Sequence, residues 1–321
     1  MSDETIEKTF QVGTPARLII SNIRGSVTIQ PGSEGVIEVK ALKHGNSMSA
    51  SDLIDMRQDA DGSVRVETRS NELFFGMFSV PPKVDYSIRV PQGVHLDASC
   101  ISSGLDVSGL SGTFKLKTIS GDMELNSLAG PIKLNAVSGD ISGTNLAGVL
   151  ELGTVSGRVR VTESNFPSAD ASTVSGDLIL QTPIADGPYQ FGSVSGSVHL
   201  LVPKDTHCKV EINSVSGKIR SSLPVSSLAM GHGVKVTQVG SGGTTIRLKS
   251  VSGGLSIETE GVPATTVPDT NASATTFIPP APPTPPAMTS PAPVSTEEIL
   301  QRIERGELTV DEAIKLMKGQ S

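Results

Sequence analysis

The amino-acid sequence predicts an all-β fold, a β-solenoid (β-helix) with coils of about 18 residues, followed by a linker and a small helical hairpin. A Val-Ser-Gly tripeptide or a close variant recurs seven times between residues 119 and 253. Apolar and polar residues alternate after most of these glycines, which is the period of a β-strand. Aromatic residues make up only 3% of the chain. A narrow coil explains this low content, because Val, Ile and Leu fill its thin interior.

The repeat is strict at first and then loosens: its first six glycines, from Gly121 to Gly217, are spaced 18, 18, 19, 20 and 21 residues apart. Weaker copies lie midway, so glycines 112 to 157 follow one another every nine residues. Residues such as Met123 and Leu125, two and four positions after a glycine, give a short strand one apolar face. We expect glycine to allow a bend or a positive φ before each strand. Two nine-residue halves make one coil. The seven copies begin at Ile119, Val137, Val155, Val174, Val194, Val215 and Val251.

Residues 1–260 are predicted to form the solenoid, with an irregular part over 1–100 and regular repeats over 101–260. Residues 23–29 read as an early copy of the repeat unit. Further strands are expected at 36–40, 64–68 and 84–90. A solenoid needs capped end coils, and we expect the last coil near residues 248–258.

Two different segments follow the predicted solenoid. Residues 261–294 are expected to be a disordered, proline-rich linker, since 262–294 contain ten prolines and one charge. Residues 295–321 predict a helical hairpin, with capping boxes at Ser295/Glu298 and Thr309/Glu312. A hairpin this small cannot sustain its own core, so we expect it to dock on a protein partner or on a second copy. Its predicted apolar contact residues are Ile299, Leu300, Ile303, Val310, Ile314 and Met317.

A second candidate contact segment contains three of the eight phenylalanines, Phe74, Phe75 and Phe78, ahead of two prolines. One interpretation is a hydrophobic cap over the solenoid. The alternative is an exposed loop that contacts a membrane surface or a partner groove.

The sequence predicts a protein that is not an enzyme, with no cofactor, no metal and no small-molecule substrate. The five histidines are scattered singly, and neither a nucleophile elbow nor a Walker loop is present. Asp122, Asp140 and Asp177 follow repeat glycines. They are interpreted as turn residues that bond nearby backbone amides, with a calcium-binding column as the alternative. A net charge of −7 argues against nucleic acid as a partner.

Compartment is predicted from the N-terminus and the cysteines. The first ten residues are polar and acidic, without the apolar core of a signal peptide, and no apolar run is long enough to span a membrane. Cys100 and Cys208 match no metal or redox spacing and are expected to be buried thiols. We therefore expect a cytoplasmic protein, with a peripheral position at the membrane as the alternative.

The segments TFQVG (9–13), LIISNIRGSVTIQPG (18–32) and VDYSIRVPQG (84–93), followed by serial Ser-Gly-Asp strands, resemble the bacterial β-strand-repeat proteins known as "putative adhesins", a domain of unknown function. The resemblance covers about residues 6 to 258. The tail EEILQRIERGELTVDEAIKLMK (297–318) is similar to short helical domains found beside this repeat in bacterial envelope-stress proteins.

The leading hypothesis is therefore a non-enzymatic binding or scaffold module. The resemblance implies a role in bacterial cell-envelope stress sensing or signalling. One alternative is a structural polymer similar to bactofilin filaments, which needs uncapped solenoid ends. Another is a surface adhesin, which needs an export route.

Overall fold

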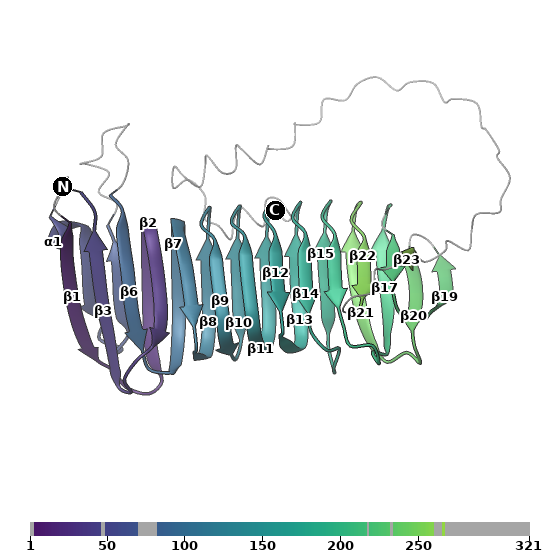
Figure 1. Ribbon diagram of the computed structural model, residues 1–321, viewed down its shortest axis with the longest axis horizontal. Helices are drawn as coiled ribbons and strands as arrows, with labels where there is room; N and C mark the ends of the chain where they lie inside the picture. The colour runs from purple at the N-terminus through teal and green to yellow at the C-terminus, as the bar shows by residue number, and fades with distance from the viewer. Residues whose placement is uncertain are drawn as a thin grey trace, which may run out of the picture. The chain divides into compact units, whose positions relative to one another are not determined.

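The computed structural model describes residues 3–45, 49–69, 82–216, 218–231, 234–259 and 265–266, with backbone alone for 227–231, 234 and 265–266. In these residues the chain is all-β, with one short helix. The strands stack as a β-solenoid, as the sequence predicts (Figure 1). The predicted linker and helical hairpin lie outside the described residues.

The regular coils have two strand faces, and their register confirms the coil length. Ile132 pairs with Phe114 on one side and with Leu150 on the other, so parallel neighbours are 18 residues apart. Two long strands, β7 (Gly93–Ser108) and β11 (Ile141–Thr154), run through both faces. One face also contains β8 (Ser111–Thr118), β10 (Ile132–Ala136), β13 (Asn165–Thr173) and β15 (Tyr189–Ser193). The other contains β9 (Met123–Ala129), β12 (Val159–Thr162), β14 (Leu178–Gln181) and β16 (Val198–Leu201).

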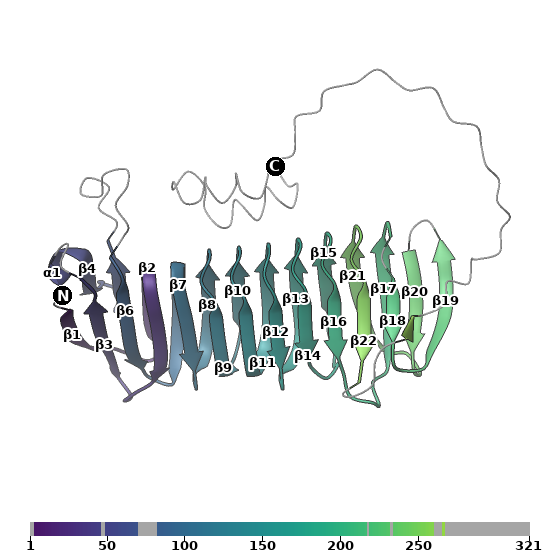
Figure 2. The ribbon, with the colours of Figure 1, turned by 45° about the horizontal axis from the view of Figure 1, so that its top comes forward.

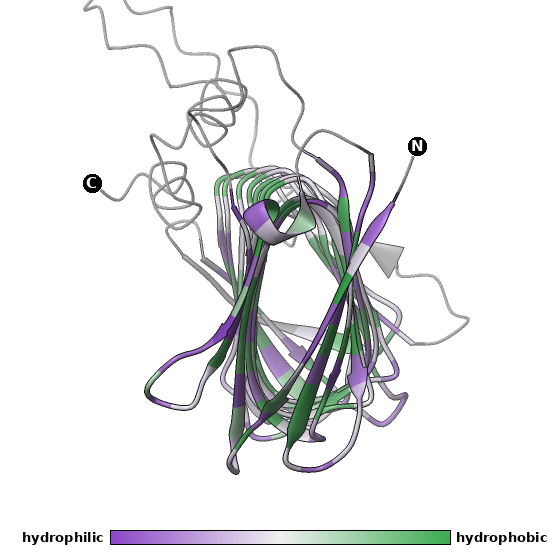
Figure 3. Cartoon of the chain, turned by 90° about the vertical axis from the view of Figure 1, so that its left-hand side faces the viewer, coloured by the Kyte–Doolittle hydropathy of each residue, from purple (hydrophilic) through white to green (hydrophobic). Residues whose placement is uncertain are grey.

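The interior is a stack of buried apolar side chains from the two faces. Figure 3 views the two faces end-on, with the chain coloured by hydropathy and its hydrophobic segments in green. At one level, small residues make room for the aromatic rings of the next level. Ala169 and Ala171 pair with Tyr189 and Phe191 on the next strand, and all four are buried. The Tyr189 hydroxyl donates a hydrogen bond to the Phe166 carbonyl oxygen at 2.6 Å. The buried ring therefore keeps its polar atom satisfied.

Glycine is required at the corners because successive coils approach closely there. A Cβ on Gly139 would lie 2.0 Å from the carbonyl oxygen of Gly121, one coil earlier. The midway glycines also have the expected positive φ, as at Gly130 with φ +127°. In contrast, Gly139 and Gly121 have no such φ, so proximity alone excludes a side chain there. The Thr118 hydroxyl accepts a hydrogen bond from the Gly121 amide at 3.0 Å and closes the turn.

The N-terminal residues add strands to the first regular coil in an order that differs from the sequence. The long strand β2 (Ala16–Pro31) pairs with β7 on one side and with β5 and β6 on the other. Antiparallel strands then complete this end. The strands expected at 36–40, 64–68 and 84–90 are confirmed, the first running on to residue 43. The remaining strands are β1 (Glu4–Gln11), β3 (Val36–Lys43), β4 (Ile54–Gln58), β5 (Val64–Thr68) and β6 (Val84–Val90).

Side chains join the outermost strands of the two faces, β1 and β4, at the N-terminal end. Lys8 Nζ donates to the Met56 carbonyl oxygen at 2.7 Å, and Gln58 Nε2 to that of Gln11 at 2.8 Å. The short helix α1 (Ala50–Leu53) buries Leu53 beside these strands. The end of the apolar interior is thereby covered.

One polar network lies inside this end. The buried Asn22 Nδ2 donates to the Val84 carbonyl oxygen at 3.0 Å and to Ser103 Oγ at 2.9 Å. Its Oδ1 accepts from Thr68 Oγ1, which also contacts the Tyr86 hydroxyl at 2.7 Å. Because each polar group has a partner, the network replaces apolar packing without leaving an unsatisfied buried group.

At the C-terminal end the last repeat in the sequence is not the last coil in space. Strand β21 pairs with β15 on one side and β17 on the other, and β22 lies between β16 and β18 (Figure 2). Accordingly, a Cβ on Gly253 would lie 2.1 Å from the Gly196 carbonyl oxygen. The strands are β17 (Cys208–Ser214), β18 (Ile219–Ser221), β19 (Val225–Gly231), β20 (Val234–Val239), β21 (Thr244–Ser250), β22 (Leu255–Glu258) and β23 (Thr265–Thr266).

The expectation that the last coil lies near residues 248–258 is therefore wrong. The end is formed by β17 and β18, with antiparallel β20 and β23 beside them and β19 beyond β20. The physical reason is that each repeat specifies which residues face inward but not which coil it stacks on. The antiparallel pair β19–β20 reverses the direction of the chain. Strands β21 and β22 can then stack between the coil of β15 and β16 and the coil of β17 and β18.

Candidate functional site

The contact residues predicted from the sequence lie outside the described residues. This holds for Phe74, Phe75 and Phe78 and for the apolar residues of the hairpin, 299–317. Their roles stay predictions, and the site has to be sought on the described outer surface of the solenoid.

The aspartates after the repeat glycines bond backbone amides, as the turn interpretation predicts. Asp122 Oδ1 accepts from the Asp140 amide at 2.9 Å, and Asp140 Oδ1 accepts from the Arg158 amide at 2.7 Å. Asp177 Oδ1 does the same for the Ser197 amide at 3.1 Å. Each carboxylate thus ties its own coil to the next. No group of three or more His, Cys, Asp or Glu side chains suited to a metal is found within the described ranges.

Both cysteines are buried and unpaired, as expected. Burial raises the pKa of Cys100 to about 12 and that of Cys208 to about 11. A thiol with such a pKa is protonated at neutral pH and is a poor nucleophile. The two residues act as small apolar groups of the interior.

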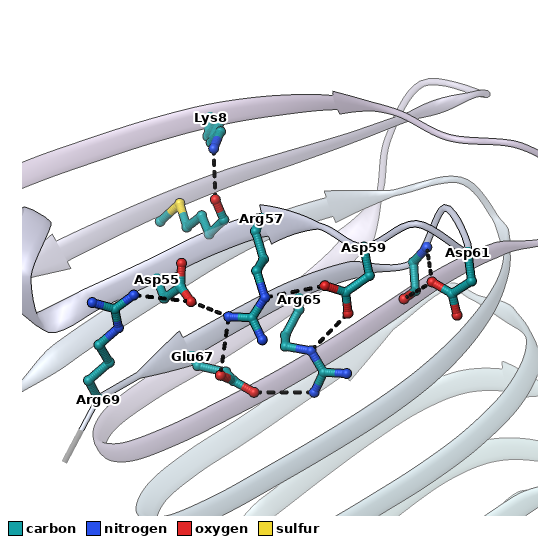
Figure 4. Close-up of polar contacts among 10 residues, drawn as sticks. Lys8, Asp55, Arg57, Asp59, Asp61, Arg65, Glu67 and Arg69 are labelled. Carbon is teal, nitrogen blue, oxygen red and sulfur yellow. Dashed lines mark hydrogen bonds and ion pairs between the residues drawn. The ribbon is translucent and has the colours of Figure 1, made fainter.

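The N-terminal end carries a network of charged side chains on β4 and β5 and on the residues directly after each strand (Figure 4). Arg57 contacts Asp55, Asp59 and Glu67, and Arg65 bridges the last two at 3.0 and 3.2 Å. Burial alone would raise the pKa of Asp55, but the hydrogen bond and charge of Arg69 and those of Arg57 place it below 3.8. The arginines and carboxylates of this network pair with one another. The network therefore links the two strands and leaves few charged groups available to bind a ligand.

Histidine takes part in a second cluster at this end, which sequence reasoning missed. His44 lies between two carboxylates, with Nε2 2.6 Å from Asp85 Oδ2 and Nδ1 3.2 Å from Asp3 Oδ2. The same Asp85 accepts from the Ser26 amide and hydroxyl, both at 2.9 Å. Asp3, His44 and Asp85 are each more than 40 positions from the next in sequence, so only the strand pairing brings them together.

One hollow, of about 350 Å³, lies over β1, β3 and β6 at the N-terminal end. Two others lie on the outer face toward the C-terminal end. The larger hollow has a volume of about 520 Å³. It is mostly apolar, with Pro183, Leu201, Val202 and Pro203 in its lining and Glu163 and Lys204 as its charged residues. It lies where the repeat lengthens from 18 to 20 and 21 residues, because the added residues form loops after β14 and β16. The remaining lining residues are Ser164, Gln181 and Thr182.

The smaller hollow has a volume of about 290 Å³ and lies across β16, β22 and β18. It is polar and basic, with His199, Lys218 and Arg220 beside four serines. Its serines are Ser197, Ser216, Ser252 and Ser256.

The two hollows share strand β16. His199 lines the smaller hollow and Leu201 the larger, and residues two apart on a strand point to the same side, about 7 Å from each other. The sequence contained a signal for the larger hollow, namely the longer spacing of the repeats that line it. The smaller hollow could not be derived, since β22 enters between β16 and β18 out of sequence order.

No helix within the described part of the chain is long and apolar enough to cross a membrane. The expected cytoplasmic location stays a prediction.

Comparison with known proteins identifies the family. The model of the Toastrack family, DUF4097, matches residues 16–258. Among solved structures, a "putative adhesin" from Bacteroides fragilis is 12% identical, covering 80% of this chain and 97% of that chain, with a TM-score of 0.40. A "putative lipid binding protein" from Parabacteroides distasonis is also 12% identical, covering 80% and 96%, with a TM-score of 0.41. No curated protein matches. The chain belongs to the Toastrack family (DUF4097), a family of unknown function.

Proposed function

We propose that this chain is a non-enzymatic binding module whose ligand lies on the outer face around β16. The observation that carries the proposal is the larger hollow, which combines an apolar lining with a few polar groups. Ligand sites in proteins have this composition, and its volume falls within their usual range. The ligand class that fits best has an apolar part that Leu201 and Pro203 contact.

The solenoid supports this role as a rigid scaffold. Each coil is joined to the next by parallel strand pairing and by the corner glycines, so the surface residues keep a fixed spacing. Antiparallel strands are present at both ends. The outermost described strands therefore do not continue the parallel stacking of the coils, which supports a discrete particle over the bactofilin-like polymer.

The test is binding of the apolar dye Nile red to the full-length protein. Leu201→Asp places a charge in the larger hollow and is expected to remove most of the fluorescence increase. Val149→Asp is the matched control, since Val149 is an aliphatic side chain, 50% exposed, on another part of the surface. Equal binding by the wild type and Leu201→Asp would refute the larger hollow as the site.

The finer part of the proposal is a role in bacterial cell-envelope stress sensing or signalling, with residues 295–321 as the docking or oligomerisation element. It is supported by the resemblance of residues 297–318 to helical domains of envelope-stress proteins. Light-scattering mass of full-length protein, with and without Ile303→Asp and Ile314→Asp, tests self-association. A mass that falls to the monomer in the double variant supports it, whereas an unchanged oligomer argues against it.

A further inference from the structure

We propose that the smaller hollow, across β16, β22 and β18, binds an oxyanion such as a phosphate or sulfate group. The proposal concerns a different hollow from the one that carries the proposed function, and it names the charged group of the ligand. It rests on the arrangement of side chains, on their unpaired charge and on a comparison with earlier coils.

Strand pairing arranges the side chains of this hollow in two rows. His199 pairs with Ser256, which pairs with Arg220, and these three residues form one row. The other row consists of Ser197, Gly254 and Lys218. Backbone hydrogen bonds set this alignment, since the Val198 amide donates to the Gly254 carbonyl oxygen. In the same way, the Leu255 amide donates to the Lys218 carbonyl oxygen. Gly254 has no side chain. It therefore leaves space between the Ser197 hydroxyl and the Lys218 side chain.

The two strong cations of the hollow are available for a ligand. Among the described residues, Lys218 and Arg220 make no ion pair. Both are exposed; Arg220 lies on β18 and Lys218 directly before it, and residues two apart on extended chain point to the same side. A guanidinium fork and an ammonium group together match the donor pattern that phosphate and sulfate require. Serine hydroxyls add neutral donors at short range.

Within the described ranges, two carboxylates border the hollow, and both already have partners. Glu258 accepts a hydrogen bond from Ser256 and lies 3.8 Å from His199 Nδ1. Asp177 accepts from the Ser197 amide. Neither contacts Lys218 or Arg220, so the basic side of the hollow keeps its positive charge. Ser256 is only 6% exposed and forms part of the floor.

In most of the earlier coils, the positions that correspond to Lys218 and Arg220 do not hold a pair of basic residues. The row of Lys218 is occupied by Asp122, Asp140 and Asp177 in other coils, which bond backbone amides. Only Arg158 and Arg160 repeat the basic pair, and they line neither the larger nor the smaller hollow. They are also exposed, with Arg160 on β12 and Arg158 directly before it. This pair supplies a control with the same charge, spacing and strand position.

The experiment compares full-length wild type, Lys218→Gln/Arg220→Gln and Arg158→Gln/Arg160→Gln. Inorganic phosphate is titrated by calorimetry at low ionic strength. Sedimentation is measured with phosphatidylcholine vesicles, with and without about one-third phosphatidylglycerol. We expect binding to weaken at least about tenfold in the Lys218/Arg220 variant and to change less than about twofold in the control. Both variants replace exposed side chains and are expected to fold.

Each outcome decides the proposal. Selective loss of phosphate binding supports a soluble anionic ligand, and selective loss of vesicle binding alone supports a lipid headgroup. Equal loss in the two variants would show general charge attraction and overturn the site. Absence of binding to either probe by the wild type would also overturn it. The Nile red measurement is independent of these variants, so failure here is distinguishable from failure of the proposed function.

Discussion

The two ends of the solenoid share a topology and differ in whether particular basic side chains are ion-paired. At both ends the chain runs past an inner level and later returns, so that β2 and β21 lie between strands that are not their sequence neighbours. At the N-terminal end, Arg57 and Arg65 each contact more than one carboxylate. At the C-terminal end, Lys218 and Arg220 have no such partner among the described residues. The difference therefore concerns these four residues: Arg57 and Arg65 are ion-paired, whereas Lys218 and Arg220 make no ion pair within the described residues.

The largest expected effect comes from breaking the returned coil at the C-terminal end. Gly253→Ala would place a Cβ 2.1 Å from the Gly196 carbonyl oxygen and 2.8 Å from Ser193 Oγ. The first clash is with backbone and cannot be relieved by a side-chain rotation, so we expect a loss of more than about 3 kcal/mol in unfolding free energy. Thermal unfolding measured by circular dichroism checks this.

The control for that variant is Gly104→Ala, since a Cβ there meets nothing within 4 Å and the φ is not in the left-handed region. We expect a change within about 0.5 kcal/mol. Similar stability of the two variants would contradict the close stacking of Gly253 on Gly196, and with it the position of β21 and β22.

The fold was predictable from the sequence to a large extent. The Val-Ser-Gly period gave the coil length, the alternation of Met123 and Leu125 gave the inward face, and both are confirmed by the register. The stacking order was not predictable. Repeats such as those at Val215 and Val251 carry the same inward pattern, so periodicity cannot say which of them lies next to Val194.

An intermediate effect is expected from the Asp85 cluster at the N-terminal end. Burial alone would raise the pKa of Asp85, but hydrogen bonds from His44, Ser26 and Lys83 lower it below 3.8. A carboxylate with a lowered folded pKa stabilises the protein above its unfolded pKa, and this contribution is lost as the pH falls through the folded value. Asp85→Asn should therefore cost about 1 kcal/mol at neutral pH.

The pH dependence makes this prediction specific. The difference between wild type and Asp85→Asn should shrink as the pH falls from about 5 to about 2, measured by urea unfolding. The matched control is Asp97→Asn, whose carboxylate pairs with Lys115 on an exposed face at 2.9 Å and should matter little. A difference that stays constant with pH would argue against an ionised Asp85 as the stabilising group.

The smallest effect compares one arginine from each end. Arg57→Gln leaves Asp55, Asp59 and Glu67 with less positive charge and should lower the melting temperature, less so in molar NaCl. Arg220→Gln removes no ion pair within the described residues and should leave the melting temperature unchanged. Calorimetric melting in low and high salt separates the two. Equal shifts in melting temperature would contradict the difference in ion pairing between Arg57 and Arg220.

The candidate site was less predictable than the fold, for a physical reason. His199, Arg220 and Ser256 come from three repeats and meet only because β22 lies between β16 and β18. The sequence pointed to Phe74–Phe78 and to the hairpin of residues 295–321 instead, since exposed apolar clusters are visible in one dimension. A polar hollow built from separate strands leaves no such local pattern.

The central claim about the out-of-order strands is that the smaller hollow, across β16, β22 and β18, binds an oxyanion. Hydrogen–deuterium exchange of the full-length protein, with and without phosphate, tests it most directly. The account predicts added protection in 197–201, 218–221 and 254–258 together, with no change in 54–68. Protection confined to the N-terminal charged strands, or in only one of the three segments, would contradict it.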